Sequence, residues 1–338
     1  MIIPSSLKKT GGAERQLYIL KKKLKKKNKI YFLSNKLDKN KILFLLKIFI
    51  YIILSKKKID LVHIHTINSP ALIGSLAAKL IGKPSIVKIP RNGLNSSINL
   101  YNKNNLGKLY LFFLKKTVSK FICLTKFAEK ELKSFGFKKE KLIVIPNGVE
   151  ITLDKNIKKN KNFNHYVFAG RLIKRKKIDE IILAFKKIFK NKKKKLFIIG
   201  EGPELKKLQQ LDSDIPSISK VFFLGNKNNA FVQKQFEKCA FFIMNSTSEG
   251  LSNSLLEAMS KSCVVIVRKI KGIDEILKDN RNSIIFRNKN GLIEKLKNYN
   301  NYKKLIDISE NAFMTINKSY NINFIADRYI DLYKKLIN

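Results

Sequence analysis

Two glutamates flank a change of character in the stretch NSTSEGLSNSLLEAMSKS, residues 245–262. Glu249 lies in a small, polar segment that contains glycine, and Glu257 lies in the helix-forming segment that follows it. Glycine lets the backbone of such a turn approach a ligand closely. The helical neighbours of Glu257 are polar, so this residue could belong to a stripe that faces a ligand cleft. Helical spacing leaves equally open a solvated face with a Glu257–Lys261 pair.

Five basic residues follow the run HYVFAG and precede the helix-forming run IDEIILAF: Arg171, Lys174, Arg175, Lys176 and Lys177. They would crowd the start of a helix, where the helix dipole favours acids instead. A bound anion would remove this conflict, because a helix start also offers free N–H groups. Lysine is common throughout the chain, so a solvated basic segment explains this stretch equally well.

Two further motifs in this half of the chain are weaker. In FIIGEGPEL, Gly200 and Gly202 permit a tight strand-to-helix turn, and Pro203 suits a first helical turn. A lone G-x-G is weak evidence for a ligand site, since most such turns are only turns. The D-x-D of LDSD, residues 211–214, follows a helix rather than a strand, so we interpret it as chance.

The first half of the chain offers smaller candidates. Gly11 and Gly12 precede a helix-forming run in TGGAERQLYIL and could present N–H groups to phosphate. His63 and His65 lie on the same side of a predicted strand, and a neutral His65 near its carboxyl end could donate to a sugar hydroxyl. Arg91 follows another strand end and could contact an acceptor. A plain loop and a buried structural histidine are the simpler alternatives.

Short β-branched or aromatic runs alternate with longer helix-forming runs along the whole chain. The continuous apolar character of the short runs indicates strands covered on both faces, and their alternation with helices predicts parallel, doubly wound α/β sheets. Ligands in such sheets bind at the carboxyl ends of the strands. The predicted strands are 30–34, 60–66, 85–90, 120–125 and 141–148, and then 165–171, 195–200, 220–225, 241–246, 263–268 and 282–286.

The strand–helix pattern runs twice, which predicts two facing doubly wound domains with a cleft. A length of 338 residues also favours two domains over one. A polar segment without apolar periodicity separates the two patterns, and the last residues form an amphipathic helix pattern. We therefore assign domains to 1–152 and 165–318, a linker to 153–164 and a C-terminal helix to 319–338.

The chain is strongly basic, with 70 Lys+Arg against 25 Asp+Glu and a formal net charge of +45. Compositional drift is the simplest explanation, since lysine, asparagine and isoleucine are abundant everywhere. Attraction to an anionic membrane ranks second. Nucleic-acid binding ranks last, because we find no recognition helix, zinc finger or aromatic RNA-binding signature, and no nucleic-acid partner is expected.

The apolar run 42–54, interrupted by Lys47, is too short to span a bilayer. It predicts a helix packed under a sheet, which could still touch the inner face of a membrane through its flanking lysines. The N-terminus lacks the apolar core of a signal peptide, so we expect a cytoplasmic protein. Cys123, Cys239 and Cys263 lie in or beside apolar runs and should be buried and reduced.

Together these segments resemble the family-4 retaining glycosyltransferases, which have the two-domain GT-B fold. The match runs over nearly the whole chain, and the order and spacing of the motifs make chance improbable. The resemblance implies an acceptor-side first domain, a nucleotide-sugar-binding second domain and a C-terminal helix packed back on the first. The matching motifs are GGAER (11–15), HIH (63–65), PNGVE (146–150), AGRLIKRKK (169–177), IIGEGPEL (198–205) and EGLSNSLLEAM (249–259).

The resemblance implies roles for residues of the second domain. Arg171 and Lys176 would neutralise the donor diphosphate. Glu257 would bind the nucleotide ribose, and Glu249 would touch the hydroxyls of the donor sugar as a catalytic residue. The donor sugar would also lie against Gly250, Leu251, Ser252 and Asn253.

In the first domain, Gly12 would face the diphosphate and His65 would meet the transferred sugar as a second catalytic residue. Gly11 and Arg91 would lie near the acceptor. No metal and no cofactor are implied, because the nucleotide diphosphate sugar is a co-substrate.

The implied activity is transfer of a sugar, with retention, from a nucleotide diphosphate sugar, expected to be UDP-linked. The implied acceptor is a glycan or lipid-linked glycan precursor of a cell-surface polysaccharide such as lipopolysaccharide. Two alternatives remain: a degenerate, non-catalytic family member and a basic nucleic-acid-binding protein. An NAD-type dehydrogenase is disfavoured, because GEGPEL lacks the third glycine of the dinucleotide fingerprint.

The chain departs from the family pattern at several places. Lys177 stands where glycine usually follows the arginine–lysine pair. Ser262 and Val264 stand where glycine and proline are usual, and Lys271 takes the first place of a later Gly–Gly. Only MIIPSS remains for the first strand of the first domain, which makes the stability of that domain a question.

Overall fold

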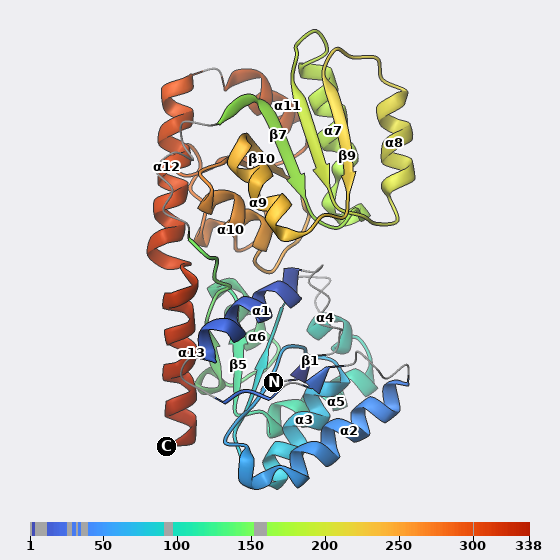
Figure 1. Cartoon of the computed structure of the whole chain (residues 1–338). Coiled ribbons are helices and arrows are strands. Elements are labelled where there is room, and N and C mark those ends of the chain that lie inside the picture. The colour runs from blue at the N-terminus through green and yellow to red at the C-terminus, as the bar shows by residue number, and fades with distance from the viewer. Residues whose placement is uncertain are drawn as a thin grey trace. The chain divides into compact units, whose positions relative to one another are not determined.

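The computed structural model describes residues 2–3, 12–25, 29–31, 33–34, 40–90, 97–151, 161–299 and 301–338. It divides the chain into two compact units, each built on a parallel sheet with helices on its faces (Figure 1). This arrangement confirms the predicted α/β class with two doubly wound sheets. The first unit comprises Met1–Gly148, Glu249–Leu251 and Ile322–Asn338, and the second comprises Val149–Ser248 and Ser252–Asn321.

The sheet of the first unit has the strand order β2-β1-β3-β4-β5-β6, and all of its neighbouring strands are parallel. The chain moves outward from β1 to β2 and then crosses back to β3, so the winding direction reverses between β1 and β3. Such a switch point is where open α/β sheets bind ligands. The strands are β1 (Ile2–Ile3), β2 (Leu33–Ser34), β3 (Val62–Ile64), β4 (Ser85–Lys88), β5 (Lys120–Cys123) and β6 (Leu142–Val144).

Helices cover both faces of this first sheet. Right-handed crossovers place α2, α3, α5 and α6 on one face and α1 on the other. Two separate apolar clusters fit this division, one with residues of α2, α3 and α5 and one with residues of α1 and α13. The helices are α1 (Gly12–Leu24), α2 (Lys41–Leu54), α3 (Ser69–Leu80), α4 (Ser97–Tyr101), α5 (Asn105–Thr117), α6 (Lys126–Ser134) and α13 (Ile322–Ile337), with short 3-10 turns η1 (Lys56–Lys58) and η2 (Lys139–Lys141).

The C-terminal helix α13 packs against α1 and the sheet of the first unit. Its buried face carries the residues that the amphipathic pattern predicts: Ile322, Ile325, Ala326, Tyr329, Leu332 and Tyr333. Arg328 adds a hydrogen bond from its guanidinium to the carbonyl of Val144 in β6.

The sheet of the second unit has the order β12-β11-β10-β7-β8-β9 and is also parallel throughout. Its switch point lies between β7 and β10. The strands are β7 (Asn162–Ala169), β8 (Lys195–Ile199), β9 (Lys220–Gly225), β10 (Cys239–Met244), β11 (Val264–Arg268) and β12 (Ile284–Phe286). The helices are α7 (Ile178–Ile188), α8 (Leu205–Ser213), α9 (Asn229–Lys238), α10 (Asn253–Ser260), α11 (Lys289–Asn298) and α12 (Tyr302–Ser319), with 3-10 turns η3 (Lys174–Lys176) and η4 (Ile273–Glu275).

Every strand that the sequence predicts is present, although most strands are shorter than the apolar runs from which they were predicted. The strand β7 begins at Asn162, inside the interval 153–164 assigned to a linker. The three cysteines are buried and free, as expected, and burial raises the pKa of Cys123 and Cys239 to about 12.

Candidate active site

The cations that follow β7 do not lie on a helix, contrary to the sequence interpretation. They occupy a loop and the 3-10 turn η3, and α7 begins only at Ile178. The first turn of α7 carries Asp179 and Glu180, which suit the positive end of the helix dipole. The argument that a helix dipole opposes these cations is therefore wrong. A positively charged loop at the end of a central strand remains.

The loops after β7 and β8 run side by side through backbone contacts. The amide of Gly170 donates to Ile199 O, and the amide of Leu172 donates to Glu201 O, both at 2.9 Å. A Cβ at Gly200 would lie 2.0 Å from Gly170 O. A Cβ at Gly202 would similarly lie 2.1 Å from the Leu172 carbonyl oxygen. The G-x-G that looked like an ordinary turn is thus required by a neighbouring backbone.

The two cations assigned to the diphosphate lie in this loop. Arg171 is exposed, and no hydrogen bond or ion pair from its side chain to another described residue is found. Lys176 is half-buried, with Nζ 3.8 Å from the position that a Cβ on Gly170 would take. Both side chains therefore stand at the carboxyl end of β7, beside the switch point.

Lys177 has left-handed backbone angles, φ 49° and ψ 47°, directly before α7. Its carbonyl accepts a hydrogen bond from Asn245, whose side chain also donates to Glu180 at 2.9 Å. Glu180 in turn lies 3.4 Å from the Lys177 ammonium and 3.3 Å from Arg268. This network joins the cationic loop to the end of β10 and to β11.

The segment after β10 is held against the same loop. The amide of Thr247 donates to Arg175 O at 3.0 Å, and the Arg175 guanidinium donates to the carbonyl of Ser248. Glu249 follows directly and is half-buried. The two segments that the sequence singled out independently therefore meet at the carboxyl edge of one sheet.

Glu257 lies on α10, which begins where expected because Ser252 caps it by accepting from the amide of Leu255. The side chain of Glu257 is only 5% exposed and accepts a hydrogen bond from Gln233 at 3.2 Å. Lys261 pairs with Glu237 of α9 at 2.7 Å. The interpretation of Glu257 as part of a solvated face is wrong, because the tertiary fold buries the side chain.

The altered segment after Glu257 still ends α10 in the usual way. Ser262 has φ 53°, its amide donates to Met259 O, and the amide of Cys263 donates to Ala258 O at 3.0 Å. This pair of bonds is the Schellman motif, in which glycine is common at the left-handed position. Serine occupies that position here at some cost in backbone strain, and the helix is kept.

The D-x-D motif has a structural explanation. Asp212 lies in the last turn of α8 and is 2.7 Å from the buried ammonium of Lys186 on α7. Lys186 also donates to the carbonyls of Asp212 and Ile215. The motif therefore joins α8 to α7.

In the first unit, His63 and His65 stack with ring centroids 4.1 Å apart, close to the switch point of that sheet. His63 Nδ1 shares a hydrogen bond of 2.7 Å with the hydroxyl of Tyr333. Burial and the nearby Lys88 ammonium hold the pKa of both histidines well below the usual value, and His63 lowers that of His65 further. The Nε2 of His65 is buried without a hydrogen-bond partner among the described residues. A neutral His65 is therefore available to a ligand.

Lys88 is a functional candidate that the sequence analysis missed. It is the last residue of β4, is 8% exposed, and donates to Asn147 Oδ1 at 2.8 Å. Burial lowers its pKa to about 8. A lone lysine in the apolar run SIVKIP was the available signal, since a strand covered on both faces should not contain a charge.

The remaining predictions in the first unit concern glycines and one arginine. Gly12 is the first residue of α1, and Gln16 of that helix exchanges two hydrogen bonds with Gly148, at 2.7 and 3.2 Å. This exchange fixes α1 beside the PNG segment. Gly11 and Arg91 lie outside the described residues.

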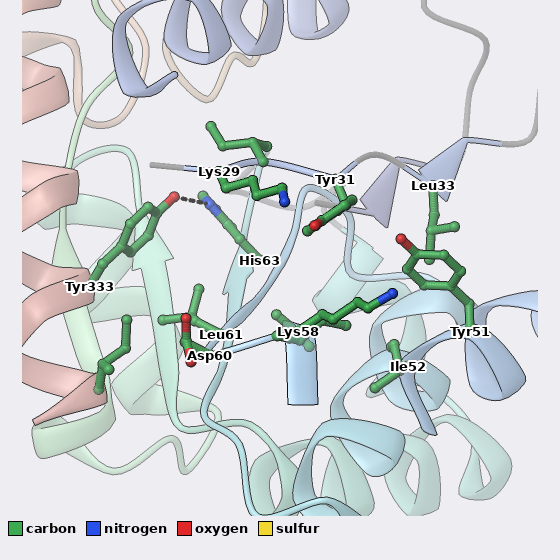
Figure 2. Close-up of a pocket in the computed structure, with 14 residues that line it drawn as sticks. Lys29, Tyr31, Leu33, Tyr51, Ile52, Lys58, Asp60, Leu61, His63 and Tyr333 are labelled. Carbon is green, nitrogen blue, oxygen red and sulfur yellow. Dashed lines mark hydrogen bonds between the residues drawn. The ribbon is translucent and has the colours of Figure 1, made fainter. Parts of the chain in front are cut away.

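A cavity of about 130 Å³ lies at the other edge of the first sheet (Figure 2). Tyr31 and Asp60, which precede β2 and β3, line it together with Tyr51, Lys58 and His63. Parallel sheets bind ligands at the carboxyl ends of their strands, so this amino-edge cavity is not the predicted site. Figure 2 shows His63 and Tyr333 joined at one side of it.

Comparison with known proteins gives two family matches that together span most of the chain. Residues 149–313 match the family described as Glycosyl transferases group 1, and residues 29–153 match Glycosyltransferase Family 4. The uncharacterized glycosyltransferase MJ1178 of Methanocaldococcus jannaschii is 31% identical over 248 residues, which cover 72% of this chain and 66% of that protein.

Two further relatives have informative names. The Escherichia coli UDP-Gal:alpha-D-GlcNAc-diphosphoundecaprenol alpha-1,3-galactosyltransferase is 26% identical over 307 residues, covering 85% of this chain and 78% of that protein. The crystal structure of Anabaena Alr3699/HepE in complex with UDP and glucose has a TM-score of 0.81 at 16% identity and covers 99% of both chains. The structural likeness establishes the fold, which is that of the GT-B glycosyltransferases.

Proposed function

This chain belongs to the glycosyl transferases group 1 family, and on that premise we propose that it transfers a sugar, with retention, from a UDP-linked donor to a glycan or lipid-linked glycan acceptor. The second unit would bind the nucleotide sugar, and the first would bind the acceptor. The names of relatives support this choice, since one uses UDP-Gal and a diphosphoundecaprenol acceptor. Another was crystallised with UDP and glucose.

One observation carries the proposal. At the switch point of the second sheet, the exposed Arg171 stands on a loop locked by backbone contacts, and the buried Glu257 lies on the helix that follows the neighbouring strand. A diphosphate requires fixed cations, and a ribose requires a fixed hydrogen-bond acceptor. Arg171 and Glu257 would supply these groups from one edge of one sheet, which supports donor binding there.

The reaction needs stabilisation of a leaving group. Breaking the sugar–phosphate bond places negative charge on the diphosphate and oxocarbenium character on the sugar. Arg171, Lys176 and the amides at the start of α10 would stabilise that charge from fixed positions. Glu249 would hold the sugar hydroxyls, and the neutral His65 would donate a hydrogen bond to the sugar from the acceptor side.

Retention follows if the acceptor hydroxyl attacks from the face of the leaving group, with a phosphate oxygen as base. No side-chain nucleophile is assigned. Water must be excluded for the acceptor to compete, and domain closure of the kind common in such enzymes would provide this.

The test is a panel of nucleotide sugars examined by thermal shift and by nucleotide release with an added acceptor. We expect a UDP-sugar to raise the unfolding temperature, because ligands that bind only the folded state stabilise it. Glu257→Ala should weaken donor binding by about tenfold, the effect of a lost hydrogen bond to a charged group. Glu249→Ala should abolish most turnover. Glu294→Ala, on the exposed side of α11, is the matched control and should change neither.

Three outcomes would contradict the proposal. Full sugar transfer by Glu249→Ala would remove its catalytic assignment. Donor binding by the wild type without turnover on any acceptor would favour the non-catalytic alternative. Stabilisation by DNA or RNA, with no response to nucleotide sugars, would favour a nucleic-acid-binding protein.

A further inference from the structure

Two histidines of the first unit point into a largely apolar layer beside β3. Val62 and Ile64 pack into the cluster that contains residues of α2, α3 and α5, so His63 and His65 point to the opposite face of the sheet. The helix α13 covers that face and buries mainly apolar side chains against it. An imidazole in such surroundings needs a hydrogen-bond partner, because an unpaired buried polar group costs free energy.

The partner of His63 comes from α13, 270 residues further along the chain. His63 Nδ1 and the hydroxyl of Tyr333 lie 2.7 Å apart, and the two rings meet edge to face with centroids 5.8 Å apart (Figure 2). His63 is only 2% exposed and Tyr333 only 8%, so little water can compete for this hydrogen bond. The hydroxyl of Tyr333 thus restricts how the His63 ring can turn.

The proton in this hydrogen bond can be assigned. Burial raises the pKa of Tyr333 well above its usual value and lowers the pKa of His63 well below its own, so both groups are neutral. An imidazole nitrogen is more basic than a phenol oxygen, so Tyr333 donates and Nδ1 of His63 accepts. The ring proton of His63 then lies on Nε2, because the bond made by one ring nitrogen sets the protonation of the other.

The ring of His65 lies against the ring of His63. Their centroids are 4.1 Å apart, with an angle of 30° between the ring planes. No hydrogen bond between the His65 ring and another described residue is found, and its Nε2 is buried. Packing against His63 is therefore a main constraint on the His65 ring within the part of the chain that the structure describes. A rotation of the His63 ring would pass directly to His65.

We propose that Tyr333 is a positioning residue for sugar transfer: by donating to Nδ1 it fixes the ring of His63, and that ring holds His65 where it meets the donor sugar. This inference rests on the proposed function, since His65 has this task only if a sugar is transferred. In this arrangement His63 supports the neighbouring ring and His65 contacts the ligand. Each histidine of the HIH motif then has a distinct role.

A hydrogen bond that only stabilises the fold is the simpler explanation, and Tyr329 allows the two roles to be separated. Tyr329 lies one turn before Tyr333 on the same buried face of α13, with its ring centroid 5.5 Å from that of His63. Its hydroxyl is buried without a hydrogen-bond partner among the described residues. Tyr329→Phe therefore removes the same atom from similar surroundings without breaking a bond to His63.

The first test compares the steady-state kinetics of Tyr333→Phe and Tyr329→Phe with a nucleotide sugar and an acceptor. We expect Tyr333→Phe to lower kcat by about tenfold, because a misplaced His65 loses its contact in the transition state. KM for the nucleotide sugar should stay within about twofold of the wild type, since most groups proposed to bind the donor lie in the second unit. Tyr329→Phe is the matched control and should keep the wild-type kcat and KM.

The second test needs no substrate. The chain contains three histidines, so long-range proton–nitrogen NMR spectra can resolve the ring nitrogens of each one. In the wild type, His63 should carry its proton on Nε2 and none on Nδ1. Tyr333→Phe should shift the ring signals of both His63 and His65, whereas Tyr329→Phe should leave the protonation of His63 as it is. His165, in the second unit, should respond to neither variant.

A third variant examines whether Tyr333 acts through His63. His63→Phe keeps an aromatic ring beside His65 but cannot accept a hydrogen bond from Tyr333. Adding Tyr333→Phe to His63→Phe should therefore change kcat by no more than about twofold, because the hydroxyl has no bond to His63 left to lose. Thermal unfolding checks that each variant keeps its fold.

The outcomes separate this inference from the proposed function. A wild type that transfers no sugar would contradict the proposed function, and the NMR spectra alone would then decide whether Tyr333 orders the two histidines. A proton on Nδ1 of His63 in the wild type, or unchanged His65 signals in Tyr333→Phe, would overturn the inference. Equal kcat in Tyr333→Phe and Tyr329→Phe would also overturn it, as would losses that multiply in the double variant.

Discussion

The carboxyl edge of the second sheet is organised by backbone contacts, whereas that of the first sheet is organised by buried side chains. In the second unit the loops after β7 and β8 approach so closely that Gly200 and Gly202 have no room for a Cβ. In the first unit, Lys88 at the end of β4 binds Asn147 through a side-chain hydrogen bond, and the ring of His65 lies against that of His63. The two edges belong to the same kind of fold, but different interactions hold their polar groups in place.

The difference fits two kinds of ligand. Backbone packing fixes the loop that carries Arg171 and Lys176 at the end of β7, which suits a diphosphate. The buried network around His65 keeps the imidazole neutral, which suits the uncharged hydroxyls of a sugar. Four predictions examine this contrast, beginning with the largest expected effect.

Gly200→Ala should be the most damaging single change in the second unit. The new Cβ would lie 2.0 Å from Gly170 O, and φ of 138° is itself unfavourable for alanine. We expect a loss of about 4 kcal/mol in the free energy of unfolding, from overpacking and backbone strain together. Chemical denaturation measures this loss.

Gly291→Ala on α11 is the control, because its Cβ would meet Phe286 at an ordinary 3.5 Å. Helical alanine should be neutral or slightly stabilising there. If Gly200→Ala were as stable as the wild type, close backbone packing would not organise the carboxyl edge of the second sheet.

Arg171→Ala/Lys176→Ala should reduce kcat/KM for the nucleotide sugar by about 100-fold or more, because charge on the leaving group would lose its fixed cations. Folding should be preserved, since Arg171 is exposed and Lys176 half-buried. Steady-state kinetics with a fixed acceptor measures the effect. Lys174→Ala, in the same loop and also exposed, should stay within about twofold of the wild type. A similar loss in Lys174→Ala would mean that only the general charge of the loop matters.

Lys88→Met should remove the contribution of a buried lysine to the pH dependence of the free energy of unfolding. The pKa of Lys88 is lowered to about 8 by burial, while an unfolded lysine titrates near about 10.4. Between these values the unfolded chain binds more protons than the folded chain, so stability rises with pH. The free energy of unfolding of the wild type, relative to that of Lys88→Met, should therefore rise by on the order of 3 kcal/mol between pH ~8 and ~10.4.

The measurement is urea unfolding of both proteins at a series of pH values, with the difference between them as the readout. Taking the difference cancels the titration of the many exposed lysines. Lys206→Met on α8 is the control and should show no such slope. If the free energies of unfolding of the wild type and Lys88→Met differed by the same amount at every pH, Lys88 would be solvated. The carboxyl edge of the first sheet would then not be a low-dielectric site.

Lys177→Gly and Ser262→Gly should each stabilise the second unit by about 1 kcal/mol. Both residues have positive φ, 49° and 53°, where a side chain costs roughly 1 to 2 kcal/mol. Part of the gain is offset, because Lys177→Gly removes the ion pair with Glu180 and glycine gains entropy when unfolded. Thermal unfolding measures the shift. Lys174→Gly, which has no positive φ, should instead lose stability.

The sequence alone determined the fold class and the alternation of its elements. Each strand was visible as an apolar run because a parallel sheet is covered on both faces. It also placed Glu249 and the cation loop at strand ends, because the carboxyl ends of parallel strands share one edge. Even the departures from the family pattern were readable, and Lys177 and Ser262 do adopt the left-handed backbone that glycine usually takes.

Only the tertiary structure decided what surrounds each of these residues. Helical spacing could not place Glu257, which is buried because Gln233 of α9 lies beside it. The need for Gly200 comes from the carbonyl of Gly170, and the lowered pKa of Lys88 comes from its burial in the folded chain. The exposure of Leu46 likewise depends on what the fold leaves uncovered. Local patterns encode periodicity and backbone preference, but burial and close contact are properties of segments distant in the chain.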